Sequence, residues 1–374
     1  MTMKKKIKKN NSRPSALYIH IPFCNHLCNY CDFCKVEYFR HWAKDYLKEL
    51  FKELDSHNIK SLKTIYIGGG TPTALDDDLF EELLKRVFSY LNGVKEYTIE
   101  ANVESLTERK LQLMKKYGVN RLSLGVESTD ETVLKAINRK HTYADIKKII
   151  PLARSYGFDN INVDLIMGLP NTTLEDLKKD IERILLLEVE HISTYSLIIE
   201  KNTIFYHQNI KRKTDEEERA EYDLVHKMLT EHGFLHYEIS NFAKPGKKSA
   251  HNLTYWKNEQ YYGVGLGAAG YLNGRRYQNT RGITSYLRGK RILESEEITP
   301  FEDEEYFIIL NLRTSDGIDD ELFFQKFGHS FIETYRAKIA EFVDNESLIL
   351  KDKTIYLSYK GMMILDFILL KILN

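Results

Sequence analysis

The sequence has no net charge, no long hydrophobic run and no cysteine outside one short window. Basic and acidic side chains are equal in number, 54 of each among 374 residues, so no overall field favours nucleic acid as a partner. The most apolar stretch, residues 362–373, contains Asp366 and Lys371 and is well short of the roughly 20 residues that span a bilayer, which indicates a core helix. No apolar segment of signal-peptide length follows the N-terminal lysines. We therefore expect a cytoplasmic protein that binds no nucleic acid and is not an integral membrane protein.

Short β-rich runs alternate with amphipathic helical stretches over residues 16–200. The predicted strands begin at Leu17, Thr64, Glu96, Arg121, Asn160 and His191, and the predicted helices between them cover residues 42–57, 78–91, 107–117, 143–156 and 174–187. Connections of this kind force neighbouring strands to be parallel. A closed eight-stranded barrel typically takes about 250 residues. The spacing therefore predicts an α/β fold, either an incomplete (β/α)6 barrel or an open sheet.

The rest of the chain is predicted to form three other parts. Residues 1–15 carry six basic and no acidic side chains, which is typical of a disordered, solvated tail. Residues 201–300 are expected to form a loop-rich extension, with an acidic helix over 215–232 followed by little clear periodicity. Residues 301–374 return to helical spacing and predict a small helical C-terminal domain, with a short strand at 354–357 before the last helix.

All four cysteines lie within eleven residues, directly after the first predicted strand; they are Cys24, Cys28, Cys31 and Cys34. A disulfide framework would spread its cysteines to close long loops, so a metal or redox role fits better. The C-x3-C-x2-C spacing can hold three irons of a [4Fe-4S] cluster and leave the fourth iron open to another ligand. Two alternatives stay open, namely a zinc site completed by His20 or His26 and a C-x-x-C redox pair.

Polar and glycine residues follow the other predicted strands. The second strand ends in the run TIYIGGGTPT, whose glycines let a ligand approach the backbone, or form a simple turn or a phosphate cradle. Glu100, Glu127 and Asp164 stand at or near the ends of later strands. A carboxylate inside such a strand is costly unless it is paired or bound by a ligand. Ligands of α/β folds bind at the carboxyl ends of the strands, so we expect these residues to share a site.

The cysteine loop and the glycine run together resemble the radical S-adenosylmethionine (SAM) proteins. The resemblance implies that Cys24, Cys28 and Cys31 ligate a [4Fe-4S] cluster and that SAM chelates its fourth iron. It further implies that SAM is contacted by Tyr18, Tyr30, Gly69, Gly70, Thr71, Glu100, Glu127, Arg139 and Asp164. One departure is that relatives carry Gln where this chain has Glu127.

Six motifs carry a closer resemblance, to the heme-chaperone branch of the oxygen-independent coproporphyrinogen III oxidase family. These motifs are YIHIPFC, GGGTPT, RLSLGVES, NVDLIMGLP, YEISNFAKPG and HNLTYW. The oxidases of this family carry the motif C-x3-C-x2-C-x-C. This chain has Phe33 at the position of their fourth cysteine. HNLTYW resembles a heme-binding motif, which implies that His251 is a heme ligand. If this segment is helical, Tyr255 shares its face, although a lone histidine among aromatic residues is more often packed and hydrogen-bonded.

The resemblance implies a heme chaperone that binds heme and passes it to an acceptor protein. The alternative within the same family is an oxidase that decarboxylates the propionates of coproporphyrinogen by radical SAM chemistry. Either role implies an electron donor such as a flavodoxin or a ferredoxin-like protein, and the chaperone role is compatible with a homodimer.

Overall fold

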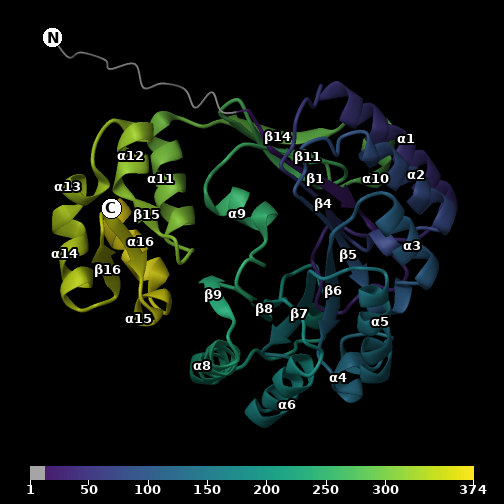
Figure 1. Ribbon diagram of the computed structural model, residues 1–374, viewed down its shortest axis with the longest axis horizontal. Helices are drawn as coiled ribbons and strands as arrows, with labels where there is room; N and C mark the ends of the chain where they lie inside the picture. Colours follow the sequence, from purple (N-terminus) through teal and green to yellow (C-terminus); the bar gives the residue numbers. More distant parts are fainter. Residues whose placement is uncertain (1–12) are drawn as a thin grey trace.

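One twelve-stranded sheet organises most of the chain in this computed structural model, which describes residues 13–374 (Figure 1). Residues 1–12 of the predicted basic tail lie outside the described residues. Six parallel strands form the centre of the sheet, in the order β1 (Ala16–Ile21), β4 (Thr64–Gly69), β5 (Glu96–Asn102), β6 (Arg121–Glu127), β7 (Ile161–Met167) and β8 (His191–Ser196). The six predicted strands and their parallel arrangement are confirmed.

Helices connect these strands and cover one face of the sheet (Figure 1). They are α1 (Arg40–Ser56), α2 (Asp77–Phe88), α3 (Glu108–Lys116), α4 (Glu131–Ala136), α5 (Tyr143–Ser155) and α6 (Leu174–Leu185), of which only the short α4 was not predicted. Side chains at the N-termini fix where the helices begin. The hydroxyls of Thr142 and Thr173 each accept a hydrogen bond from a backbone N–H three residues later, in a capping box completed by aspartate.

Alternation along the strands separates an apolar face from a polar one. On β6, Leu122, Leu124 and Val126 join the main hydrophobic core, while Arg121 and Glu127 line a cavity on the opposite face. We call this opposite face, which the helices α1–α6 do not cover, the inner face. Every functional residue of the sheet discussed below lies on it.

The extension holds more regular structure than the sequence predicted. It adds β11 (Tyr261–Val264), β12 (Ala269–Leu272), β13 (Arg275–Asn279) and β14 (Ile292–Glu297) beside β1, and β10 (Asn241–Ala243) and β9 (Leu235–Glu238) beside β8. These strands are short, which leaves little alternation to detect, and the pairings that join them to the central sheet, β11 with β1 and β10 with β8, are distant in sequence. The sheet has two edges, β14 and β9, and is therefore an incomplete barrel. The extension also carries α7 (Ile204–His207), α8 (Asp215–Glu231), α9 (Ala250–Trp256) and α10 (Ile283–Leu287).

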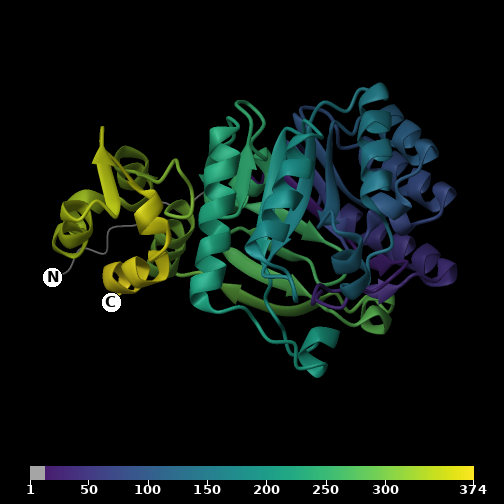
Figure 2. The same ribbon diagram turned by 90° about the horizontal axis from the view of Figure 1, so that it is seen from below.

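The C-terminal part packs around a hydrophobic cluster of its own, and it lies at one end of the molecule beside α8 (Figure 2). Its helices are α11 (Pro300–Asn311), α12 (Asp320–Phe327), α13 (Phe331–Thr334), α14 (Arg336–Asp344), α15 (Tyr359–Met362) and α16 (Leu365–Leu373). They surround a small sheet of β15 (Ile318–Asp319), β17 (Thr354–Leu357) and β16 (Leu348–Lys351). The strand at 354–357 is confirmed, and the other two were not predicted.

The apolar stretch at 362–373 is only partly the core helix that was predicted. Its main helix, α16, buries Leu365, Ile368, Leu369 and Ile372 but leaves Leu370 61% exposed, so it is amphipathic. Within residues 13–374, no helix is both long and apolar enough to cross a membrane.

Candidate functional site: a cavity on the inner face

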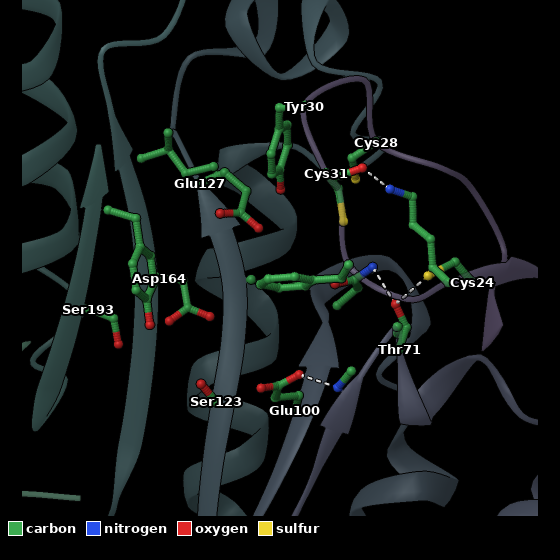
Figure 3. Close-up of a pocket in the computed structure, with 18 of the residues that line it drawn as sticks. Cys24, Cys28, Tyr30, Cys31, Thr71, Glu100, Ser123, Glu127, Asp164 and Ser193 are labelled. Atoms are coloured by element: carbon green, nitrogen blue, oxygen red, sulfur yellow. Dashed lines mark hydrogen bonds between the residues drawn. The ribbon is translucent and has the colours of Figure 1, made fainter. Parts of the chain in front are cut away.

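A cavity of about 350 Å³ lies on the inner face, beside the carboxyl ends of the parallel strands (Figure 3). This volume is in the range of small-molecule sites. The predicted site residues that line it are Cys24, Cys28, Tyr30, Cys31, Gly69, Gly70, Thr71, Glu100, Glu127, Arg139 and Asp164. The fold thus brings together residues that are up to 140 positions apart in the sequence. Tyr18 and His251 do not line the cavity.

The cysteine loop is held at its base by a short parallel pair of strands, β2 (Phe23–Cys24) and β3 (Val36–Glu37). The Thr71 hydroxyl lies 3.7 Å from the Cys24 Sγ, and Arg139 Nη1 lies 3.9 Å from the Cys28 Sγ. Burial raises the pKa of the Cys24 thiol to about 12 and also raises that of Cys28. Both thiols therefore stay protonated until a metal displaces their protons, while Thr71 and Arg139 are placed to stabilise the resulting thiolates.

The donor set fits an iron–sulfur cluster better than a single zinc ion. Within residues 13–374, no three His, Cys, Asp or Glu side chains are close enough together to share one metal ion. A zinc site draws all its sulfurs to about 2.3 Å from one ion, whereas the thiolates of a cluster bind different irons. His20, one candidate for completing a zinc site, has Nε2 at 2.6 Å from the backbone oxygen of Cys34.

Cys34 does not share the environment of the other three cysteines. Its side chain does not line the cavity, and its Sγ lies 3.7 Å from the backbone oxygen of Arg281. The structure thus separates Cys24, Cys28 and Cys31 from Cys34.

The glycine run lets the end of β4 approach the cysteine loop. Gly69 has a φ of +114°, and a Cβ on Gly70 would lie 2.7 Å from the backbone carbonyl of Pro22. The backbone N–H of Gly69 donates to Glu100 Oε2 at 2.9 Å. Because this N–H already serves a carboxylate, the arrangement does not favour the phosphate cradle left open by the sequence.

Three buried carboxyl groups face the cavity. Burial raises the pKa of Glu100 and of Glu127 to about 7 each, and it also raises the pKa of Asp164. Glu100 Oε1 accepts a hydrogen bond of 2.7 Å from the Tyr66 hydroxyl, and Asp164 Oδ1 accepts one of 2.8 Å from the Asn162 amide. A cationic ligand would favour the ionised form of these groups, so this part of the cavity suits an amine or a sulfonium.

Arg139 is the cation that stabilises Glu127. Its guanidinium lies 4.0 Å from Glu127 and 3.8 Å from Glu104, and it also donates to the backbone oxygen of Gly125. Glu127 itself has a φ of +67°, at a register shift between β6 and β7. Such backbone strain at a non-glycine residue is typical of ligand sites.

Several residues that line the cavity from the inner face were not predicted from the sequence, namely Tyr66, Asn102, Arg121, Ser123, Asn162 and Ser193. Asn102 and Asn162 stand two positions from a residue that was predicted. A period of two along each predicted strand would have identified them.

His251 is buried on α9, and the structure leaves it no free ring nitrogen. Its Nδ1 lies 2.9 Å from the Thr64 hydroxyl and its Nε2 lies 2.7 Å from the Tyr255 hydroxyl. The residue is 1% exposed, and burial lowers its pKa to about 3. The predicted helix and the shared face with Tyr255 are present, yet in this conformation the imidazole presents no ligand atom to a heme iron. Tyr18, the other predicted residue outside the lining, lies beside Tyr66 with 6.1 Å between ring centroids.

Comparison with known proteins agrees with this architecture. Residues 18–184 match the model of the radical SAM superfamily, and residues 299–364 match that of the HemN C-terminal domain. Coproporphyrinogen III oxidase (HemN) from Escherichia coli, a radical SAM enzyme, has the same fold, with a TM-score of 0.85 and 22% identity over 98% of this chain and 91% of that one.

Curated relatives are similar over nearly the whole chain. The heme chaperone HemW of Lactococcus lactis subsp. lactis is 38% identical over 93% of this chain and 94% of its own length. HemW of Bacillus subtilis is 38% identical over 92% and 96%, and HemW of Escherichia coli is 35% identical over 80% and 82%. This chain belongs to the HemW heme chaperone family of radical SAM proteins.

Proposed function

We propose that this protein binds heme and transfers it to an acceptor protein, and that it carries a [4Fe-4S] cluster and SAM. The observation that carries the proposal is the convergence of three cysteines, a glycine run and three buried carboxyl groups on one cavity. The similarity to HemW heme chaperones of three bacteria supports the heme role over a purely catalytic one. Phe33 supports the same choice, because it occupies the position at which the oxidases of the family carry a fourth cysteine.

Cys24, Cys28 and Cys31 are proposed to hold the cluster. When bound, the cluster supplies one iron with no protein ligand, to which SAM can attach. Gly69 and Gly70 leave room beside it, and Glu100 and Asp164 offer carboxylates to the positive charges of SAM. Tyr30, which is partly buried and stands between Cys28 and Cys31 in the sequence, is proposed to pack on the adenine.

His251 is proposed as the heme ligand on one structural condition. Its imidazole is neutral, the form that binds metals. In the described conformation Nε2 is occupied by Tyr255, so ligation requires this hydrogen bond to open. Heme binding is therefore proposed to involve a movement of α9 or of the Tyr255 side chain.

The decisive experiment is anaerobic reconstitution followed by heme titration. The proposal expects iron and acid-labile sulfide at about four atoms each per chain, and a heme absorption band that changes when His251 is replaced by alanine. Parallel assays would measure deoxyadenosine and decarboxylated porphyrin. Protein that assembles a cluster but takes up no heme contradicts the chaperone role, and consumption of coproporphyrinogen with SAM replaces it with the oxidase.

Several further expectations remain proposals. We propose a cytoplasmic location, a flavodoxin or ferredoxin-like electron donor, and a homodimer as the carrier form. We also propose the boundaries 16–200, 201–300 and 301–374 for the three parts of the chain, of which the second extends the sheet of the first. Limited proteolysis, which cleaves preferentially at exposed loops, checks these boundaries.

A further inference from the structure

Arg121 is a buried cation without a hydrogen-bond or ion-pair partner, although its charge acts on Glu100 and Asp164. It is the first residue of β6, it is 2% exposed, and it lines the cavity. Its Nε has no hydrogen-bond partner, and its guanidinium forms no hydrogen bond or ion pair with any residue from 13 to 374. Buried guanidinium groups are normally paired because their desolvation is costly. Arg139, the other arginine of the cavity, has two carboxylate neighbours and a backbone acceptor.

Neutral polar groups line the cavity near this arginine, beside the acids Glu100 and Asp164. Thr98, which is in register with Arg121 on β5, has a buried hydroxyl that also lacks a partner. Ser123, Asn162 and Ser193 line the same cavity from β6, β7 and β8. Figure 3 shows Ser123 and Ser193 on the side of the cavity away from Tyr30 and Cys28. Together these groups offer a guanidinium fork, hydroxyls and an amide, which is a donor set for an anion.

The charge of Arg121 counteracts the rise in the pKa values of Glu100 and Asp164, but neither acid forms an ion pair or hydrogen bond with it. Glu100 is engaged by Tyr66 and the backbone of Gly69, and Asp164 is engaged by Asn162. Their negative charges nevertheless limit what can bind beside Arg121. A singly charged, planar carboxylate complements one guanidinium, whereas a phosphate dianion would face two acids with a single cation.

The carboxylate is not that of a SAM molecule placed on the cluster. Arg121 and Glu127 stand at opposite ends of β6, and six residues of strand span roughly 20 Å. A SAM carboxylate on the open iron would lie at the cysteine end of the cavity, beside Glu127 and Arg139. Arg121 therefore starts from the opposite end of the strand, and its charge reaches Glu100 and Asp164 in the middle of the cavity.

That opposite end meets α9. Thr64 and Glu96, the first residues of β4 and β5, hydrogen-bond to the ring and the backbone N–H of His251. The ring of Tyr66, which lines the cavity, stacks on His251 at 5.1 Å, and Asn252 of α9 lines the cavity itself. The unpaired guanidinium and the proposed heme ligand thus flank the same end of the cavity.

We propose that Arg121 is the anchor for a propionate carboxylate of the porphyrin. This inference rests on the proposed heme function and deepens it, because it assigns a contact to the carboxylate and not to the iron. It accounts for a buried arginine that forms no hydrogen bond or ion pair with any residue from 13 to 374. It also predicts that a porphyrin without iron binds, since the anchor does not depend on His251.

The test compares protoporphyrin IX, which has no iron, with its dimethyl ester, whose propionates carry no charge. Binding is measured by porphyrin fluorescence anisotropy in the cluster-reconstituted protein, for the wild type, Arg121→Gln, Arg121→Lys and the matched control Arg154→Gln. Arg154 lies on α5 and pairs with Glu190 outside the cavity. Thermal unfolding and SAM titration are recorded for every variant.

The wild type and Arg154→Gln are expected to bind the acid at least about tenfold more tightly than the ester. Arg121→Gln is expected to reduce this ratio to within about twofold of one, and Arg121→Lys to retain part of it. Arg121→Gln should fold and unfold at the wild-type temperature or above, since it removes an unpaired charge. If it does not fold, the ratio in Arg121→Lys decides.

Three results overturn the inference. The first is an Arg121→Gln protein that keeps the full preference for protoporphyrin IX over its dimethyl ester. Where that variant does not fold, the same result in Arg121→Lys counts instead. The second is a wild type that binds heme but does not distinguish acid from ester. The third is a variant that loses SAM affinity and leaves the porphyrin ratio unchanged, which assigns the guanidinium to SAM. A wild type that binds neither heme nor protoporphyrin instead contradicts the heme function itself, so the two failures are distinguishable.

Discussion

Glu100 is expected to stabilise ligand binding at the expense of the stability of the ligand-free protein. Its carboxyl group is buried on β5, and burial raises its pKa from 4.5 to about 7. The folded protein therefore retains this proton at pH values where the unfolded chain has released it. By linkage, this contribution to stability is fully present below about pH 4.5 and is lost as the pH rises through about 7. The variant Glu100→Gln removes this pH dependence.

The magnitude follows from the two pKa values. At about 1.4 kcal/mol per pH unit, ionising Glu100 in the folded state costs about 3 kcal/mol at pH 8. Glutamine has nearly the same shape and can still accept the Gly69 N–H, but the Tyr66 hydroxyl must turn its proton away from the new amide, which costs about 1 kcal/mol. We expect Glu100→Gln to raise the free energy of unfolding by about 2 kcal/mol at pH 8. At pH 5 the gain disappears.

Urea unfolding at pH 5 and pH 8, followed by tryptophan fluorescence, measures this difference. Glu82→Gln, at an exposed position of α2, is the matched control and should change little at either pH. Isothermal titration of SAM into the reconstituted protein should show Glu100→Gln binding about tenfold more weakly, because a carboxylate facing a cation is lost. A change in stability that is the same at both pH values, or a loss of stability at pH 8, refutes the reasoning.

Three other predictions, made with four variants, test separate parts of the site. Cys28→Ser should lose cluster iron and sulfide on reconstitution while Cys34→Ser keeps both, and equal loss in the two would contradict the separation of Cys34 from the other thiols. Gly68→Ala places a Cβ 2.5 Å from the Glu100 carboxyl carbon, so SAM affinity should fall about tenfold with an unchanged circular dichroism spectrum; wild-type affinity would show that the carboxyl group need not stay in place. Tyr255→Phe frees the Nε2 of His251 and should speed heme uptake in stopped-flow absorption, whereas slower uptake would mean that the hydroxyl assists heme.

The central strands could be predicted from the sequence and the edge strands could not, for a physical reason. Strands buried under helices are apolar over several residues and recur with the spacing of βα units. The strands of the extension are three to six residues long, and β11 pairs with β1, about 245 positions away. One local signal was present, because Asn273 and Gly274, both with positive φ, form the tight turn between β12 and β13.

Site residues could be predicted where the chemistry of a ligand requires a local sequence motif. They could not be predicted where only the packing of distant strands brings a residue into the site. The cysteine spacing, the glycine run and the acids at strand ends are local patterns, and the structure brings them together. Arg121 begins a strand beside polar residues and looks in the sequence like an ordinary surface arginine. Only the parallel packing of β5, β6 and β7 shows that its side chain is enclosed.

The charges of the cavity are ordered along the strands. At the cysteine end, acids with raised pKa values and the strained Glu127 are costly groups that a cationic ligand would relieve. At the α9 end, Arg121 is a costly group that an anion would relieve. Roughly 20 Å of strand separates the first and last residues of β6, and Asp164 lies between them, within reach of the charges of both Arg121 and Arg139. The arrangement therefore favours two ligands of opposite charge held in one interior, and a protein that binds one of them should bind the other more tightly, because each offsets the field that the other must enter.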